Sequence, residues 1–151
     1  MITTERLRLR TMSDQEMRRM IQNERVPELR QAYQEMLDGA VRHPESRDFY
    51  ALWEIALRDQ PGSIVGRLSF HGLSDGIAEI GYGLEEGCCG HGYMTEAVLS
   101  AARWASRQPG VRRVEAEVEA DNLASIKVLE RARFVPSGAM GEEGPRFLWQ
   151  G

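Results

Sequence analysis

The spacing of hydrophobic and polar positions changes several times along the chain, and each change marks an expected element. Residues 4–10 alternate, with leucines on one face and arginines on the other, which predicts a half-buried strand. The sequence of residues 13–16 fits a capping box, so a helix is expected to begin there. A second apolar stripe over residues 29–37 predicts another helix, which Pro27 begins and Gly39 ends.

The middle of the chain returns to a period of two. Residues 49–57 and residues 64–70 both alternate, and turn-forming residues at 59–62 separate them. This pattern predicts an antiparallel hairpin. Residues 72–76 predict a further turn, and residues 77–84 predict a third strand of the same sheet.

The second half of the chain alternates between helical and strand patterns. A glycine-rich loop precedes a helix in which apolar residues recur at helical spacing from Met94 to Ala105. Residues 111–120 predict a strand, Asn122 can cap a last helix, and residues 134–135 and 146–149 can form two closing strands. The expected order β-α-α-β-β-β-α-β-α-β-β is that of an α+β domain on a mixed sheet.

Composition narrows the classes of function. The 151 residues suit a single domain over residues 1–151, and the net charge of −4 argues against a generic nucleic-acid-binding surface. Long apolar runs are absent and the N-terminus lacks a signal-peptide pattern, so we expect a cytoplasmic protein without a membrane partner. Cys88 and Cys89 are adjacent and the histidines are scattered, so neither a disulfide scaffold nor a metal site is predicted.

The glycine-rich loop is the strongest candidate for chemistry. A strand, a Gly-x-Gly loop and a helix start can bind an anion, because the first helical N–H groups lack intrahelical partners. Residues 89–94 could therefore hold a pyrophosphate, although the same glycines could simply form a tight turn. A dinucleotide-binding fingerprint would need glycine where Thr95 stands, and the Gly-Lys-Ser/Thr of a P-loop is absent.

Three segments in this order resemble the GNAT superfamily of N-acetyltransferases, closest to its RimJ/RimL-like branch. Residues 4–10 are similar to the opening strand of that branch. Residues 78–84 and 89–97 resemble its central strand and pyrophosphate loop, and residues 121–134 resemble its Asn-x-x-Ser helix. The resemblance covers almost the whole chain.

The resemblance implies a mostly antiparallel GNAT-like sheet, acetyl-CoA as donor, and an amine acceptor that receives the acetyl group by direct transfer. The acceptor would be a small molecule or a peptide N-terminus, and a homodimer is common among relatives. Pantetheine would bond the backbone of Tyr82, Gly83 and Leu84; pyrophosphate would bind the amides of Cys89, Gly90, His91, Gly92, Tyr93 and Met94; and Asn122 and Ser125 would reach the cofactor from the last helix.

The acceptor amine must lose a proton before it reacts. Glu79 matches a position where relatives place an acidic group, and it could accept this proton directly or through a water. His71 is a second candidate base, although a lone histidine in a loop is usually just exposed. A backbone N–H near Tyr82 or Gly83 could polarise the thioester carbonyl.

Departures from the family pattern keep another function open. Gly87 and Cys89 stand in loop positions that relatives often fill with arginine or glutamine. Leu129 stands where many relatives carry a tyrosine acid, and Arg133 replaces the usual glycine before Phe134. A thiolate leaves readily, so the missing tyrosine need not abolish transfer. The alternatives are a catalytically idle acetyl-CoA-binding sensor or partner-binding module, and a nucleotide-binding module. The three glutamates at 115, 117 and 119 could be a solvated strand face or an acidic approach for a cationic amine.

Overall fold

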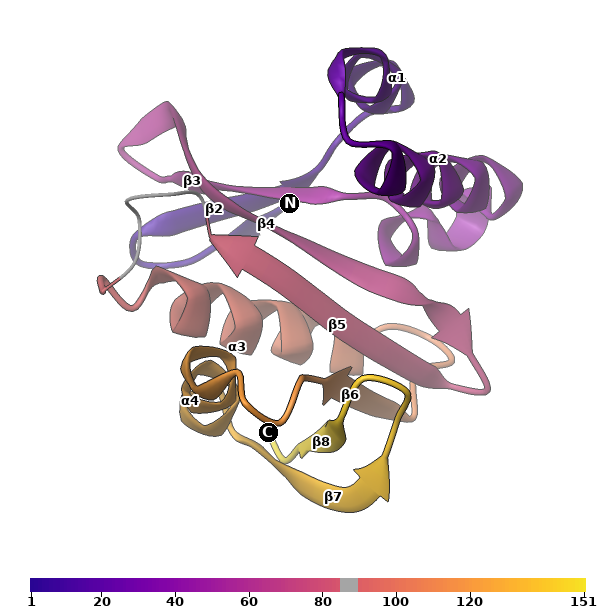
Figure 1. Cartoon of the computed structure of the whole chain (residues 1–151). Coiled ribbons are helices and arrows are strands. Elements are labelled where there is room, and N and C mark those ends of the chain that lie inside the picture. Colours follow the sequence, from indigo (N-terminus) through magenta and orange to yellow (C-terminus); the bar gives the residue numbers. More distant parts are fainter. Residues whose placement is uncertain (85–89) are drawn as a thin grey trace.

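The computed structural model describes residues 1–84 and 90–151, whose strands form one eight-stranded sheet in the order β1-β2-β3-β4-β5-β6-β8-β7 (Figure 1). Helices α1 and α2 lie on one side of this sheet and α3 and α4 on the other. The predicted α+β class and element order are confirmed, with one additional short strand at the N-terminus. The elements are β1 (Ile2–Thr3), β2 (Leu7–Thr11), α1 (Asp14–Asn23), α2 (Pro27–Arg42), the 3-10 helix η1 (Pro44–Phe49), β3 (Trp53–Leu57), β4 (Gln60–Ser74), β5 (Ile77–Leu84), α3 (Tyr93–Ser106), β6 (Arg113–Glu117), α4 (Leu123–Arg131), β7 (Phe134–Met140) and β8 (Pro145–Trp149).

The strand predicted over residues 4–10 begins only at Leu7, because residues 4–6 form a turn between β1 and β2. The Thr4 hydroxyl accepts a hydrogen bond from the Leu7 N–H at 2.9 Å, so β1 folds back antiparallel to β2. Arg6 therefore lies in the turn and not on a strand face. The predicted capping box of α1 is confirmed, because the Ser13 side chain and the Glu16 carboxylate each accept from the backbone N–H of the other residue.

Helix α2 begins at Pro27 as predicted but continues past Gly39 to Arg42. Gly39 does not end the helix; it lets the ring of Tyr50 pack against it. A Cβ atom at position 39 would stand 2.7 Å from Cδ1 of Tyr50. Among the described helices, none is long and apolar enough to span a bilayer.

Strands β3, β4 and β5 form the predicted antiparallel run, with corrected boundaries. Residues 44–49 form a 3-10 helix, so β3 begins only at Trp53. The turn before β4 narrows to residues 58–59, and β4 extends through residue 74 with an irregularity between Phe70 and Leu73. His71 is therefore part of a strand, whereas the sequence placed it in a loop.

The second half follows the predicted order, and β6 is shorter than the alternating pattern over residues 111–120. It ends at Glu117 because the chain turns there into α4, where the Asn122 N–H donates to the Glu119 carbonyl. Helix α3 packs its small residues Ala97, Ala101 and Ala105 into the core, all fully buried. Small side chains bring the helix close to the sheet.

The sheet opens between β5 and β6, which are parallel neighbours for only part of their length. Their pairing runs from Ile77 opposite Arg113 to Ile80 opposite Ala116. Beyond this point β6 follows β8, since the Val118 N–H donates to the Pro145 carbonyl, while β5 stays paired with β4 up to Leu84. In the described residues, the other edge of β5 after Ile80 therefore carries no strand.

Candidate active site

A cavity of about 690 Å³ lies where β5 and β6 part. Its walls include Glu79 and Tyr82 from β5, and Asn122 and Ser125 from the start of α4. The structure thus brings together four of the residues that the sequence singled out. A groove of about 410 Å³ on the α2 side shares Tyr82 and also contains Gly83. The two hollows share the lining residues Gly81 and Tyr82, on the edge of β5 that has lost its partner strand.

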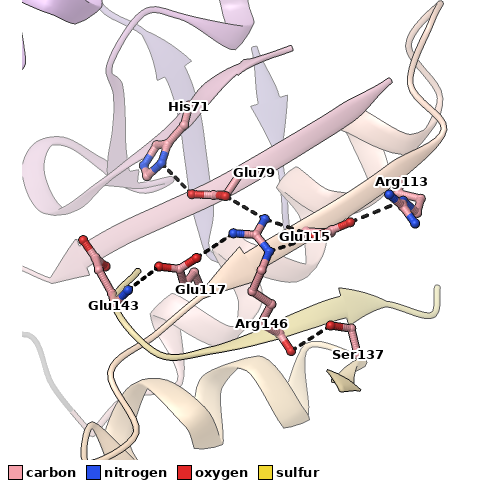
Figure 2. A network of polar contacts seen from close by, with 8 residues as sticks. All are labelled: His71, Glu79, Arg113, Glu115, Glu117, Ser137, Glu143 and Arg146. Atoms are coloured by element: carbon pink, nitrogen blue, oxygen red, sulfur yellow. Dashed lines mark hydrogen bonds and ion pairs between the residues drawn. The ribbon is translucent and has the colours of Figure 1, made fainter. Parts of the chain in front are cut away.

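One wall of the cavity is a network of charged side chains (Figure 2). The Arg146 guanidinium lies 2.7 Å from Glu79 Oε1, 3.0 Å from Glu115 Oε1 and 2.7 Å from Glu117 Oε1. Sheet register explains the cluster, because Glu79 faces Glu115 across the parallel pair and Glu117 faces Arg146 across β6 and β8. One arginine therefore compensates three carboxylates that the strands force together.

Glu79 also contacts His71, whose Nδ1 lies 2.8 Å from Glu79 Oε2. Since a carboxylate only accepts, this geometry assigns the proton to Nδ1. The hydrogen bond from His71, opposed by partial burial and reinforced by Arg146, lowers the pKa of Glu79 to about 2. The same bond raises the pKa of His71 above its ordinary value of 6.5. Of the two, His71 is the group that titrates closer to neutral pH.

The hydroxyl of Tyr82 reaches across the cavity to α4. It lies 2.8 Å from the Ser125 hydroxyl and 3.1 Å from the Ser125 carbonyl oxygen. The predicted helix cap is confirmed, because Asn122 Oδ1 accepts from the Ser125 N–H. Burial raises the pKa of Tyr82, so its phenol stays protonated.

The predicted anion site lies at the start of α3. Gly90 and Gly92 have φ values of 86° and 75°, a backbone region in which side chains are strained. Gly92 occupies the N-cap position and has no side chain that could bond the first helical N–H groups. Met94 packs into the core with 3% of its surface exposed, so only its backbone could reach a ligand. Gly87 and Cys89 lie outside the described residues.

Arg6 holds this helix start in place, a role that the sequence did not indicate. Its Nε lies 2.7 Å from Glu96 Oε1, its Nη1 donates to the His91 carbonyl at 2.7 Å, and its guanidinium carbon lies 4.7 Å from the Tyr93 ring centre. Glu96 also accepts from the Thr4 hydroxyl. A lone carboxylate in the first turn would oppose an anion, and Arg6 compensates its charge.

Leu129 and Arg133, which depart from the family pattern, both lie in the described part of the chain. Leu129 is fully buried and contributes only packing. Arg133 adopts a φ of 72°, so an arginine occupies the left-handed conformation that glycine would adopt without strain.

The comparisons with known proteins identify the family. The family model described as "Acetyltransferase (GNAT) domain" matches residues 4–135, so the chain belongs to the GNAT acetyltransferase family, whose acetyl donor is acetyl-CoA. The family that the sequence resembled is thereby confirmed.

Curated relatives match part of the chain. It is 36% identical over 85 residues to an uncharacterized N-acetyltransferase, YjdG, of Bacillus subtilis, a match that covers 55% of this chain and 50% of YjdG. It is also 36% identical over 78 residues to the probable N-acetyltransferase YjcK of the same organism, covering 50% of this chain and 43% of YjcK. The chain thus spans about half the length of the curated relatives it matches.

Solved structures match almost the whole chain in fold. An acetyltransferase from Agrobacterium tumefaciens superposes with a TM-score of 0.76 at 20% identity, covering 99% of this chain and 94% of that one. A ribosomal-protein-S5-alanine acetyltransferase from Vibrio fischeri gives 0.72 at 17% identity, with coverage of 97% and 93%. RimL in complex with coenzyme A gives 0.71 at 20% identity, also covering 97% and 93%. At these identities the similarity establishes the fold.

Proposed function

We propose that this protein transfers the acetyl group of acetyl-CoA to an amine. The observation that carries the proposal is the opening between β5 and β6. It leaves an unpaired strand edge and a carboxylate–imidazole pair beside the large cavity, and the helix that follows this strand in the chain begins with N–H groups suited to an anion. The strand edge would bind the extended pantetheine arm of acetyl-CoA, and the helix start would bind its phosphates. The carboxylate–imidazole pair would lie at its reacting thioester end.

The residues around the opening fit acetyl-CoA in shape and polarity. The free edge of Tyr82, Gly83 and Leu84 can bond the amides of the pantetheine arm as a further strand would. The amides at the start of α3, from Gly90 to Met94, can bind the diphosphate. Cys89 belongs to this proposed set on the sequence resemblance. Asn122 and Ser125 line the cavity on its α4 side. Bound acetyl-CoA would supply the electrophilic carbonyl carbon of its thioester.

The acceptor amine would lie on the Glu79 side of the cavity. An amine that resembles lysine has a pKa near ~10.4, so at neutral pH it arrives as a cation and must lose a proton. Glutamates 79, 117, 119, 142 and 143 line the cavity together with a single arginine. This excess of negative charge attracts ammonium groups. Glu79 and His71 provide the basic end of the site.

A peptide α-amine is the first acceptor to test. The solved structures with this fold include a ribosomal L7/L12 alpha-N-protein acetyltransferase and a ribosomal-protein-S5-alanine acetyltransferase, and the cavity of this chain has a volume of about 690 Å³. Small polyamines and amino sugars share the required chemistry, a primary amine with positive charge nearby.

The buried Leu129 keeps one second candidate open, an idle module that binds acetyl-CoA without transferring the acetyl group. One experiment separates the two functions. Thermal unfolding is followed with increasing acetyl-CoA, with ATP and NAD as controls, and thiol release is then measured with a panel of amines.

The proposal expects stabilisation by acetyl-CoA alone, of about 2.7 kcal/mol at 100 times the dissociation constant. It also expects thiol release that depends on the amine. Stabilisation without release by any amine would favour the idle module, and no stabilisation at millimolar acetyl-CoA would refute both functions.

A further inference from the structure

We propose that His71 is the catalytic proton acceptor of this site and that Glu79 is a positioning residue that holds it. The inference rests on the proposed transfer to an amine and assigns the roles within it. It changes the interpretation of the sequence, in which Glu79 was the leading base and His71 an exposed loop residue.

The first support is where the two imidazole nitrogens lie. Nδ1 is engaged by Glu79 at 2.8 Å, which leaves Nε2 as the nitrogen that can accept a proton. A Cβ atom added to Gly81 would stand 2.9 Å from Nε2, so this nitrogen lies beside the residue at which β5 loses its partner β6. Gly81 and His71 both line the large cavity. The free nitrogen is therefore at the reacting end of the proposed site.

The second support is that Glu79 is already engaged at both oxygens. Oε2 accepts from His71 and Oε1 accepts from Arg146 at 2.7 Å. Arg146 is itself held by Glu115 and Glu117, so it cannot swing away to free the carboxylate. A carboxylate held between the Nδ1–H of His71 and the Arg146 guanidinium gains little from binding a proton. Its effect on the reaction passes through the ring that it orients.

The third support is the balance of charge around His71. Glu79 on β5, Glu143 in the hairpin after β7, and Arg146 on β8 face the ring from the large cavity. Glu35 of α2 and the Tyr50 hydroxyphenyl ring face it from a second hollow of about 480 Å³. The hydrogen bond to Glu79, opposed by partial burial, raises the pKa of His71, and the charges of Glu79 and Glu143 add to this effect against that of Arg146. A stronger base draws the proton from an ammonium more effectively.

The proton transfer has a balanced course. Nε2 of His71 takes one proton from the acceptor ammonium, which frees the lone pair of the nitrogen to form the new N–C bond. The C–S bond breaks with its electron pair on sulfur, and sulfur takes the second proton of the amine as it leaves as a thiol. His71 then releases its proton to solvent, to which 54% of its side-chain surface is open.

The test compares His71→Gln and Glu79→Gln with the unchanged protein. A matched control, Glu45→Gln, makes the same change as Glu79→Gln at an exposed position outside both hollows. Steady-state rates with acetyl-CoA and an active amine are measured from pH 5 to pH 9. The imidazole pKa values are measured by NMR on the same proteins, and thermal unfolding checks that each variant is folded.

We expect kcat/KM of the unchanged protein to fall on acidification with a midpoint equal to the NMR pKa of His71. His71→Gln should lower kcat by about 100-fold or more. It should also remove the fall of kcat/KM at low pH, the acidic limb of the pH profile. Glu79→Gln should give a smaller loss, about tenfold, and shift both the limb and the His71 titration to lower pH. Acetyl-CoA binding should be unchanged in both variants, and Glu45→Gln should behave like the unchanged protein.

The result that overturns the inference is an active protein in which His71→Gln keeps kcat within about threefold and retains the limb. A His71 titration that is the same with and without the Glu79 carboxylate would also overturn it. Failure of the proposed function looks different, because the unchanged protein would then neither bind acetyl-CoA nor release thiol.

Discussion

Two arginine clusters lie at opposite ends of the proposed site, and they differ in what the arginine does. Arg146 compensates three carboxylates, and its side chain is 20% exposed. Arg6 meets the single carboxylate of Glu96, is 43% exposed, and also donates to a backbone carbonyl. The first cluster holds more carboxylates than guanidinium groups, and we propose that it sets the protonation of His71. The second is neutral and controls the backbone at the start of α3. The charge of the proposed acceptor site and the backbone geometry of the proposed phosphate site thus depend on different arginines.

The largest effect is expected from removing Arg146. Arg146→Met removes the guanidinium that three carboxylates share and leaves Glu115 with Arg113 and Glu79 with His71. We expect the free energy of unfolding at pH 7 to fall by about 3 kcal/mol. Glu79 has a lowered pKa in the folded protein, about 2, so its stabilising contribution is present above the pKa of an unfolded glutamate. That contribution fades as pH falls towards 2. Urea unfolding at pH 7 and pH 4 therefore measures a loss that shrinks on acidification.

A matched control for Arg146 is Arg113→Met. The Arg113 Nε contacts only Glu115, at 3.3 Å, and its side chain is 49% exposed. An exposed pair of this kind contributes less than about 1 kcal/mol. Equal losses in the two variants would show that the three-carboxylate arrangement has no special role.

The second-largest effect is expected from removing Arg6, the arginine of the other cluster. Arg6→Met should weaken acetyl-CoA binding by about tenfold, because the carbonyl of His91 and the Glu96 carboxylate lose the group that fixes them. Binding of acetyl-pantetheine, which lacks the diphosphate, should change little. Calorimetric titration of both donors measures the difference. Arg8→Met, on the exposed face of β2, is the control. An equal loss for both donors would contradict a role at the phosphates.

A smaller effect on kcat/KM is expected from changing Tyr82, which belongs to neither arginine cluster. Tyr82→Phe removes the hydroxyl that contacts Ser125 and keeps the ring. A hydrogen bond of this type contributes about 1 kcal/mol, so kcat/KM should fall about fivefold with the pH profile unchanged. A shifted acidic limb would contradict the separation of Tyr82 from the His71–Glu79 pair.

The smallest effect is expected at Arg133, which belongs to neither arginine cluster. Its substitution tests the stability of the fold and not the proposed site. Arg133→Gly relieves the left-handed backbone at φ of 72°, and it should raise the unfolding free energy by about 1 kcal/mol without changing activity. The same substitution two residues earlier, Arg131→Gly at the end of α4, should lower it by up to about 1 kcal/mol. Opposite signs in thermal unfolding support the assignment, and equal signs contradict it.

Local signals explain what the sequence could predict. The bounds of β5, the capping box at Ser13 and the cap at Asn122 depend on neighbouring residues, and all three are confirmed. Gly39 has the local signature of a helix end, yet packing against Tyr50 decides its role. Local pattern cannot show such a contact.

The parts that could not be predicted depend on pairing over long distances. Arg6 and Glu96 meet across 90 positions, and Arg146 reaches Glu117 only because β8 lies beside β6. The proposed role of His71 depends on the irregularity in β4 between Phe70 and Leu73, where His71 contacts Glu79 of the neighbouring strand. The sequence shows the residue types of the site but not their partners.

The measurement that tests the account most directly is acceptor-dependent thiol release from acetyl-CoA, with a peptide α-amine and a set of small amines. The account predicts release that saturates with both substrates and falls about 100-fold in His71→Gln. Saturable acetyl-CoA binding without release for any amine would contradict it and leave a protein that binds the donor but does not use it.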